Sequence, residues 1–178
     1  MIVLEDIYKI FGTRTTQALT LAKEGVDKSE IHTTTGQNIG LANINLSFNL
    51  GKTFVIMGLS GSGKSTLLRL LNRLITPSSG RININGTDIL SLSERQLRAF
   101  RRKHFGMVFQ SFALFPHKTV LQNVAYGLSI NGIKTEDCMK IASGWLETVG
   151  LEGYAGYYPQ QLSGGMKHHA KMFASKGS

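Results

Sequence analysis

The chain has 178 residues, 42% of them hydrophobic and 17% charged, a balance that predicts a globular protein with one sizeable core and room for a smaller attached lobe. No stretch approaches the ~20 apolar residues that a membrane helix needs, and the first residues lack the basic start of a secretory signal. The net charge of +9 is compatible with binding to nucleic acid, to an anionic membrane or to phosphate ligands. The single cysteine, Cys138, excludes an internal disulfide and fits a reducing cytoplasm.

The N-terminal part of the chain predicts two antiparallel strands separated by a helical insertion. Residues 2–8 and 43–49 alternate apolar and polar side chains, which is typical of strands with one face in water. Between them apolar residues recur at helical spacing, and Asp27 followed by Glu30 predicts a capping box that opens a second short helix. Residues 13–40 are therefore expected to form a helical insertion.

A glycine-rich segment at residues 58–66 follows a predicted buried strand, residues 53–57, and precedes a helical pattern of leucines. Its glycines allow backbone N–H groups to fold inward around phosphate oxygens, and the start of the helix adds its dipole. Lys64 would bring a positive charge to the terminal phosphates, and the Ser65 hydroxyl can ligate Mg²⁺. The alternative, a glycine-rich turn with a chance Lys-Ser, is disfavoured by the flanking strand and helix. The predicted phosphate ligands are Gly58, Ser60, Gly61, Ser62, Gly63, Lys64, Ser65 and Thr66.

The next part of the chain alternates strand and helix patterns. Residues 81–86 predict a strand, and Ser93 with Gln96 predicts a capping box for the following helix. The basic end of that helix, residues 101–104, complements the helix dipole, and no nucleic-acid-binding motif accompanies it. We therefore expect no nucleic-acid partner. Residues 105–109 predict another strand.

After Gln110 the chain is predicted to be helical. One helix is expected over residues 120–130, and a second is expected to be capped by Thr135 and ended by Gly150. Gly144 lies inside the second helix, where glycine costs about 1 kcal/mol relative to alanine. This cost predicts a packing reason or a bend at Gly144.

Residues 162–166, Leu-Ser-Gly-Gly-Met, form a second candidate anion site, with a serine hydroxyl and glycine N–H groups at a helix start. A Ser-Gly-Gly triplet alone is a weak signal. Placed after the 58–66 loop and Gln110, with helical segments between, it resembles the signature of the ABC transporter ATPases.

The resemblance extends over residues 1 to about 166. The segments 8–12, 55–66, 69–75 and 107–117, together with the helical insertion, are similar to the importers of the glycine betaine/proline type. This resemblance implies an α/β fold: a P-loop NTPase core with an antiparallel β subdomain and, at residues 111–166, a helical subdomain.

The resemblance implies a role for individual residues. Phe11 matches the aromatic residue that stacks on adenine, and core packing is the alternative. Gln110 matches the glutamine that reaches Mg²⁺ and the attacking water, so Gln110 and Lys64 are the expected catalytic residues. Ser65 and Gln110 are the expected metal ligands. The element that closes on ATP held by the opposite protomer is matched by Ser163, Gly164 and Gly165.

The implied function is the ATP-hydrolysing subunit of an importer for compatible solutes such as glycine betaine, a quaternary amine, or proline. Its implied cofactors are ATP and Mg²⁺. Its implied partners are a second copy in a head-to-tail homodimer, a membrane permease subunit that faces residues 111–117, and, indirectly, a solute-binding protein. The expected location is peripheral, at the cytoplasmic face of the membrane.

The resemblance fails after Met166, and the tail at residues 167–178 matches poorly. Nowhere does an Asp-Glu pair follow four apolar residues, and the family's switch histidine has no counterpart. These groups hold Mg²⁺, polarise water and contact the γ-phosphate. We therefore expect a fold that is incomplete at its C-terminus and low or absent hydrolysis. We also expect the segments 53–57 and 105–109 to expose apolar side chains.

Two alternative functions remain. A truncated, non-catalytic module or gene remnant would bind ATP without turnover, and ATP binding without phosphate release would identify it. A P-loop kinase for a small molecule would explain Lys64, but neither Gln110 nor residues 162–166.

Overall fold

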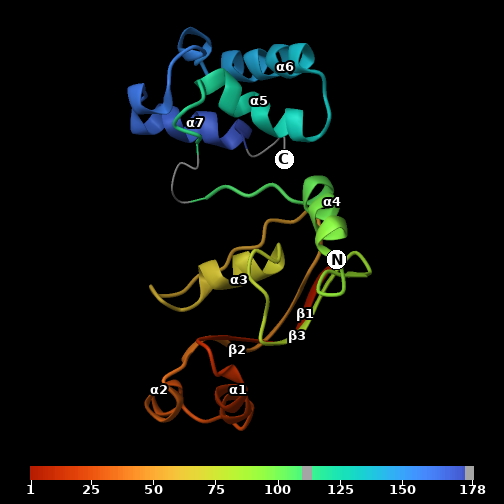
Figure 1. The fold of residues 1–178 in the computed structure, drawn as a ribbon, viewed down its shortest axis with the longest axis vertical. Helices are drawn as coiled ribbons and strands as arrows, with labels where there is room; N and C mark the ends of the chain where they lie inside the picture. The colour runs from red at the N-terminus through yellow and green to blue at the C-terminus, as the bar shows by residue number, and fades with distance from the viewer. Residues whose placement is uncertain (110–113, 175–178) are drawn as a thin grey trace. The chain divides into compact units, whose positions relative to one another are not determined.

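The computed structural model describes residues 1–109 and 114–174 (Figure 1). The chain divides into two compact units, Met1–Leu97 and Arg98–Ser178, and the boundary falls inside helix α4 (Glu94–His104). Each unit has its own secondary structure and its own packing, and each is described by itself.

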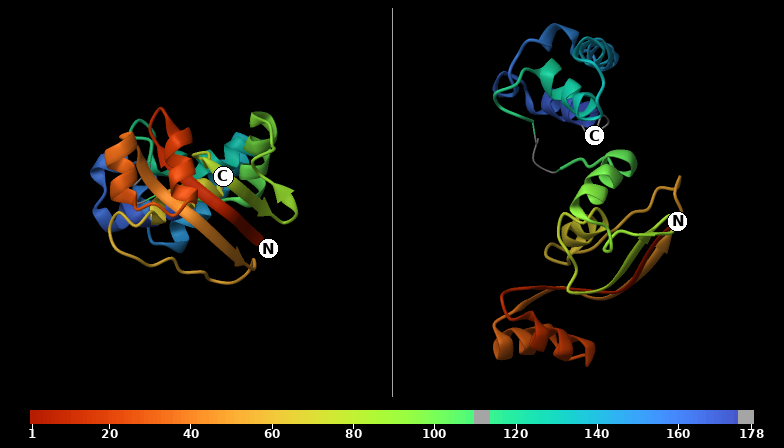
Figure 2. Two further views of the ribbon diagram at one scale, coloured as in Figure 1. Left: turned by 90° about the horizontal axis from the view of Figure 1, so that it is seen from below. Right: turned by 45° about the vertical axis from the view of Figure 1, so that its right-hand side comes forward.

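The first unit is built on an antiparallel sheet whose strand order is β2-β1-β3-β4. Its strands are β1 (Ile2–Phe11), β2 (Asn38–Phe48), β3 (Ser79–Ile84) and β4 (Thr87–Asp88). The long strands β1 and β2 run side by side (Figure 2), with Leu4 opposite Leu46. Side chains of β2 alternate between half-buried and exposed from Ala42 to Phe48. The predicted antiparallel strands are therefore confirmed.

Two helices, α1 (Thr15–Lys23) and α2 (Lys28–Thr35), connect β1 to β2 and lie beyond one end of these strands (Figure 1). They fall within the predicted insertion, residues 13–40. Ala18 and Ile31 are fully buried and belong to a hydrophobic cluster with Tyr8 and Ile10 of β1. Burial of this apolar surface attaches the insertion to the sheet.

The predicted capping box of α2 is only half correct. Asp27 is the N-cap, but its carboxylate accepts from the Ser29 backbone N–H at 2.8 Å and from the Ser29 hydroxyl, with no reciprocal bond from Glu30. These bonds from Ser29 hold the pKa of the Asp27 carboxyl below its ordinary value.

Acid is expected to weaken the start of α2. Because the pKa of Asp27 is lower in the folded state, its stabilising effect is complete above the unfolded pKa and is lost as pH falls through the folded pKa. In an NMR titration the Ser29 amide shift should have its midpoint below the ordinary Asp pKa of about 3.9. Asp27→Asn should abolish this titration, and a midpoint at or above the ordinary value would contradict the assignment.

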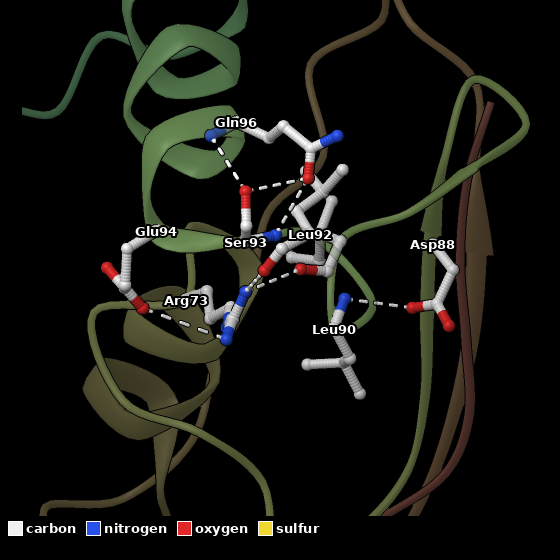
Figure 3. A network of polar contacts seen from close by, with 8 residues as sticks. Arg73, Asp88, Leu90, Leu92, Ser93, Glu94 and Gln96 are labelled. Carbon is white, nitrogen blue, oxygen red and sulfur yellow. Dashed lines mark hydrogen bonds and ion pairs between the residues drawn. The ribbon is translucent and has the colours of Figure 1, made fainter.

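Helix α3 (Lys64–Leu71) is anchored by the arginine that follows it. Arg73 Nη1 donates to the carbonyl oxygens of Ile89 at 3.1 Å and Leu92 at 2.6 Å, and Nη2 lies 3.8 Å from Glu94 Oε1 (Figure 3). These contacts tie the end of α3 to the segment that leads into α4. Within the first unit, they fix the end of α3 to the segment 89–94.

The capping box predicted for α4 is confirmed. Gln96 Oε1 accepts from the Ser93 backbone N–H at 2.9 Å, and the Gln96 N–H lies 3.4 Å from Ser93 Oγ (Figure 3). These two side chains satisfy N–H groups that a helix start leaves without an intrahelical partner.

The two predicted strands at residues 53–57 and 105–109 are wrong, because both segments are irregular. A β-strand forms only where a neighbouring strand takes up its hydrogen bonds, and no described segment pairs with either of them. The expected apolar exposure is confirmed: Val55 is 62% exposed, Met57 85% and Val108 55%.

The second unit is helical, with α5 (Val120–Ile130), α6 (Thr135–Thr148), α7 (Gly164–Ala174) and short 3₁₀ turns at Glu152–Tyr154 and Pro159–Gln161. Helix α5 has the predicted bounds. Helix α6 is capped by Lys134, not by Thr135, and Gly150 follows its end with a left-handed φ of 67°. The core is formed by Val120, Val124, Ala125, Leu128, Cys138, Ala142, Leu146, Leu151, Leu162 and Ala170.

The packing reason predicted for Gly144 is wrong. A Cβ at this position would have no heavy atom within 4 Å outside the helix, and α6 runs through the position without interruption. Gly144→Ala should therefore raise the free energy of unfolding by about 1 kcal/mol. Urea unfolding followed by the fluorescence of Trp145 checks this, and an unchanged or lower midpoint would contradict it.

Candidate functional site

The glycine-rich loop, residues 58–66, leads directly into the N-terminus of α3. Gly63 is the N-cap, with a left-handed φ of 92°. A Cβ at Gly63 would lie 2.6 Å from Leu41 Cδ2 and 2.7 Å from the Gly40 carbonyl oxygen. Both the backbone conformation and the close approach of β2 therefore require glycine at this position.

Lys64 folds back over the loop. Its Nζ donates to the carbonyl oxygens of Gly58 at 2.8 Å and Leu59 at 2.6 Å, and it lies 3.4 Å from Ser62 Oγ. The ammonium is thus held against the backbone of the loop, beside the positive end of the α3 dipole. A cation and free N–H groups at a helix start fit a phosphate group.

The remaining loop residues are accessible. Ser60, Gly61 and Ser65 are exposed, and Thr66 is half-buried on the first turn of α3. Gly61 has a left-handed φ of 79°, and the Ser62 N–H donates to the Leu59 carbonyl oxygen at 3.2 Å. The Ser65 hydroxyl lies on the first turn of α3, where a hydroxyl beside bound phosphates can ligate Mg²⁺.

Phe11 is the last residue of β1 and is 42% exposed, so part of its ring is accessible in the described part of the chain. One edge of its ring approaches Gly40 of β2, because a Cβ at Gly40 would lie 2.5 Å from Phe11 Cε2. The carbonyl oxygen of the same Gly40 approaches Gly63 of the loop. The structure therefore brings both the predicted base-stacking ring and the predicted phosphate loop close to one residue, Gly40.

The second predicted anion site is the start of α7. The Met166 N–H lies 3.4 Å from Ser163 Oγ, and the Lys167 N–H donates to the Ser163 carbonyl oxygen at 3.0 Å. Gly164 and Gly165 are exposed. The helix continues to Ala174, so residues 167–174 of the tail, which the sequence analysis placed outside the resemblance, are helical.

Gln110, the other predicted catalytic residue and metal ligand, lies outside the described residues, as do Ser111, Phe112 and Ala113. Within the described ranges, no group of three or more His, Cys, Asp or Glu side chains could hold a metal ion. No helix there has the length and apolarity to cross a membrane.

The sequence analysis missed two residues next to Phe11, Lys9 and Gly40. Lys9 could have been found, because residues two apart on a strand share a face. Gly40 carries no motif, and only the pairing of β1 with β2 shows that it lies beneath the ring.

Comparisons with known proteins identify the family of the chain. Residues 41–175 match the family model described as ABC transporter. The chain is 49% identical over 164 residues to the glycine betaine/proline betaine transport system ATP-binding protein ProV of Escherichia coli. It is also 49% identical over 166 residues to the glycine betaine transport ATP-binding protein OpuAA of Bacillus subtilis. These matches cover 92% and 93% of this chain but only 41% and 40% of the relatives' length.

The fold matches solved structures of an ATP-binding cassette. The dimeric structure of MJ0796, a bacterial ABC transporter cassette, is similar with a TM-score of 0.81 at 29% identity, over 99% of this chain and 69% of that one. A second structure of the same cassette, in a post-hydrolysis state with ADP and Pi, gives a TM-score of 0.80. These matches confirm the predicted α/β fold class, and the extent of the family match shows that this chain belongs to the ABC transporter family.

Proposed function

We propose that this chain is the nucleotide-binding part of the ATPase subunit of an importer for compatible solutes such as glycine betaine, a quaternary amine, or proline. The observation that supports the proposal is the loop at the start of α3, where Lys64 folds back onto the loop backbone beside the helix N-terminus. The names of two similar relatives, a glycine betaine/proline betaine and a glycine betaine transport ATP-binding protein, support the choice of substrate.

In this proposal the phosphates of ATP bind to residues 58–66 and the adenine stacks on Phe11. Lys64 neutralises charge on the terminal phosphates, since N–H groups alone leave most of that charge uncompensated. Ser65 and Gln110 would hold Mg²⁺, which supplies further charge neutralisation when bound. Gln110 would also orient the attacking water through its amide.

The partners follow from the same family. We propose a head-to-tail homodimer in which Ser163, Gly164 and Gly165 contact ATP held by the other protomer, supported by the dimeric structures of MJ0796. We also propose that residues 111–117 face a permease subunit, within the helical subdomain 111–166. The subunit would then be peripheral, at the cytoplasmic face of the membrane, with a solute-binding protein as indirect partner.

A second candidate function is ATP binding without turnover. It applies to the 178-residue polypeptide itself, in which no Asp-Glu pair follows four apolar residues. Positioning of water and neutralisation of charge provide most of the catalysis of phosphoryl transfer, so a polypeptide without these acids should hydrolyse ATP slowly.

The test is a titration of the 178-residue chain with fluorescent ATP in the presence of Mg²⁺, followed by a phosphate-release assay. Saturable binding is expected, with little phosphate release. Absence of binding would contradict both candidates. Release at the rate of about 1–100 s⁻¹ that is typical of phosphoryl-transfer enzymes would exclude the second candidate alone.

A further inference from the structure

The Phe11 ring stands edge-on against the backbone of β2. A Cβ at Gly40 would lie 2.5 Å from Phe11 Cε2 and 3.2 Å from Cδ2, two neighbouring atoms of one ring edge. Real Cβ atoms do not approach this closely, so any other residue at position 40 would turn the ring away. Because only an edge faces Gly40, the two faces of the ring point elsewhere.

One of those faces is covered by a cation. Lys9 Nζ lies over the Phe11 ring, 5.2 Å from its centroid, and donates a hydrogen bond of 2.8 Å to the Thr76 carbonyl oxygen. Thr76 follows the turn that ends α3. Lys9 therefore links the ring to the chain that leaves the phosphate-loop helix, while the ring keeps an exposed fraction of 42%.

Gly40 also joins the ring to the phosphate loop. Its carbonyl oxygen lies 2.7 Å from the position that a Cβ of Gly63 would take. The ring edge and the loop backbone are thus in van der Waals contact with the same residue of β2. The distance between a base on the ring and phosphates on the loop is set through Gly40.

We propose that Lys9 and Gly40 are positioning residues that hold the Phe11 ring as the platform for an adenine base. The inference rests on the proposed function and deepens it. A purine stacks on the ring face that Lys9 leaves open, and a ring fixed before binding loses less conformational entropy when the base arrives. Lys9 and Gly40 act through Phe11 and do not touch the phosphates.

The experiment compares ATP with inorganic tripolyphosphate, which has the phosphates but no base, by calorimetric titration of the full chain. Lys9→Met should weaken ATP binding about threefold through loss of the cation–π contact. Gly40→Ala should weaken it about tenfold, as Phe11→Ala does, because base–aromatic stacking is lost. Tripolyphosphate affinity should change by less than about twofold in each variant, and Lys9→Arg, which keeps a cation and a donor, should restore ATP binding.

Matched controls are available in the chain. Lys23 lies over the Tyr8 ring at 5.9 Å, so Lys23→Met removes a similar contact away from Phe11 and should leave both affinities unchanged. Gly144→Ala is the control for Gly40→Ala. Circular dichroism verifies that each variant folds. If Gly40→Ala does not fold, the ATP and tripolyphosphate affinities of Lys9→Met test the inference.

Three results would overturn the inference. ATP binding could be unchanged in Lys9→Met and Gly40→Ala while Phe11→Ala weakens it. ATP and tripolyphosphate could weaken equally, which would indicate general damage to the fold. The unaltered chain could bind neither probe, and that result would remove the proposed function as well.

Discussion

Lys64→Ala is expected to weaken the binding of both ATP and tripolyphosphate by about 100-fold or more. A hydrogen bond to a charged group is worth about 1.5–3 kcal/mol, and a factor of ten corresponds to about 1.4 kcal/mol. Lys64 would make such bonds to two phosphates, and no other lysine or arginine lies within residues 53–68. Lys64→Arg should recover only part of the affinity, because a planar guanidinium does not replace a compact ammonium. Calorimetric titration measures the effect.

Lys52→Ala is the control for this experiment. Lys52 is an exposed lysine that precedes the loop, so its removal lowers the net charge equally without touching the phosphate site. Lys64→Ala should leave the unfolding midpoint nearly unchanged, because Lys64 Nζ bonds only to exposed loop oxygens. Equal losses of affinity in Lys64→Ala and Lys52→Ala would show that the effect comes from net charge and not from a specific contact. An unchanged affinity in Lys64→Ala would contradict the proposed site.

Asn123→Ala is expected to lower the free energy of unfolding of the second unit by about 3 kcal/mol. Asn123 is 2% exposed. Its Oδ1 accepts from the Phe115 N–H at 2.7 Å, and its Nδ2 donates to the carbonyl oxygens of Phe115, Lys118 and Thr119 at 3.1, 3.0 and 2.9 Å. One buried amide thus holds the loop before α5. Truncation removes the printed partner of the Phe115 N–H and of the Lys118 carbonyl oxygen, while the carbonyl oxygens of Phe115 and Thr119 keep their backbone bonds from Lys118 and Asn123.

Urea unfolding followed by Trp145 fluorescence measures this loss. The chain has one tryptophan, and its ring lies 5.8 Å from Phe173 in the second unit, so the signal reports on that unit. Asn123→Asp keeps the acceptor but brings a carboxylate beside three carbonyl oxygens, so it should destabilise the unit at least as much. Ser129→Ala, an exposed change in the same helix, should stay within about 0.5 kcal/mol. A loss of unfolding free energy below about 1 kcal/mol for Asn123→Ala would contradict the stabilising role of these hydrogen bonds.

Local signals predicted much of the secondary structure. The capping box of Ser93 and Gln96 and the bounds of α5 were readable because the atoms involved lie within a few residues of one another. The predictions failed where the outcome depends on distant groups. The segments 53–57 and 105–109 have strand-like composition, but a strand needs a partner, and composition does not tell whether one is present. Gly144 is free of contacts, and sequence spacing cannot distinguish a crowded position from an open one.

The candidate site divides in the same way. The spacing of the glycines, Lys64 and Ser65 along the loop was enough to predict the anion site, because a continuous segment folds around one ligand with its own backbone. Phe11 lies 47 residues before the first glycine of that loop, and its position beside the site depends on strand pairing. Only the tertiary structure shows that Gly40 contacts both the Phe11 ring and Gly63, since the contact arises where β1, β2 and the loop meet. A site formed by one continuous segment can therefore be predicted from the sequence, whereas the distances between separate segments depend on how they pack in the tertiary structure.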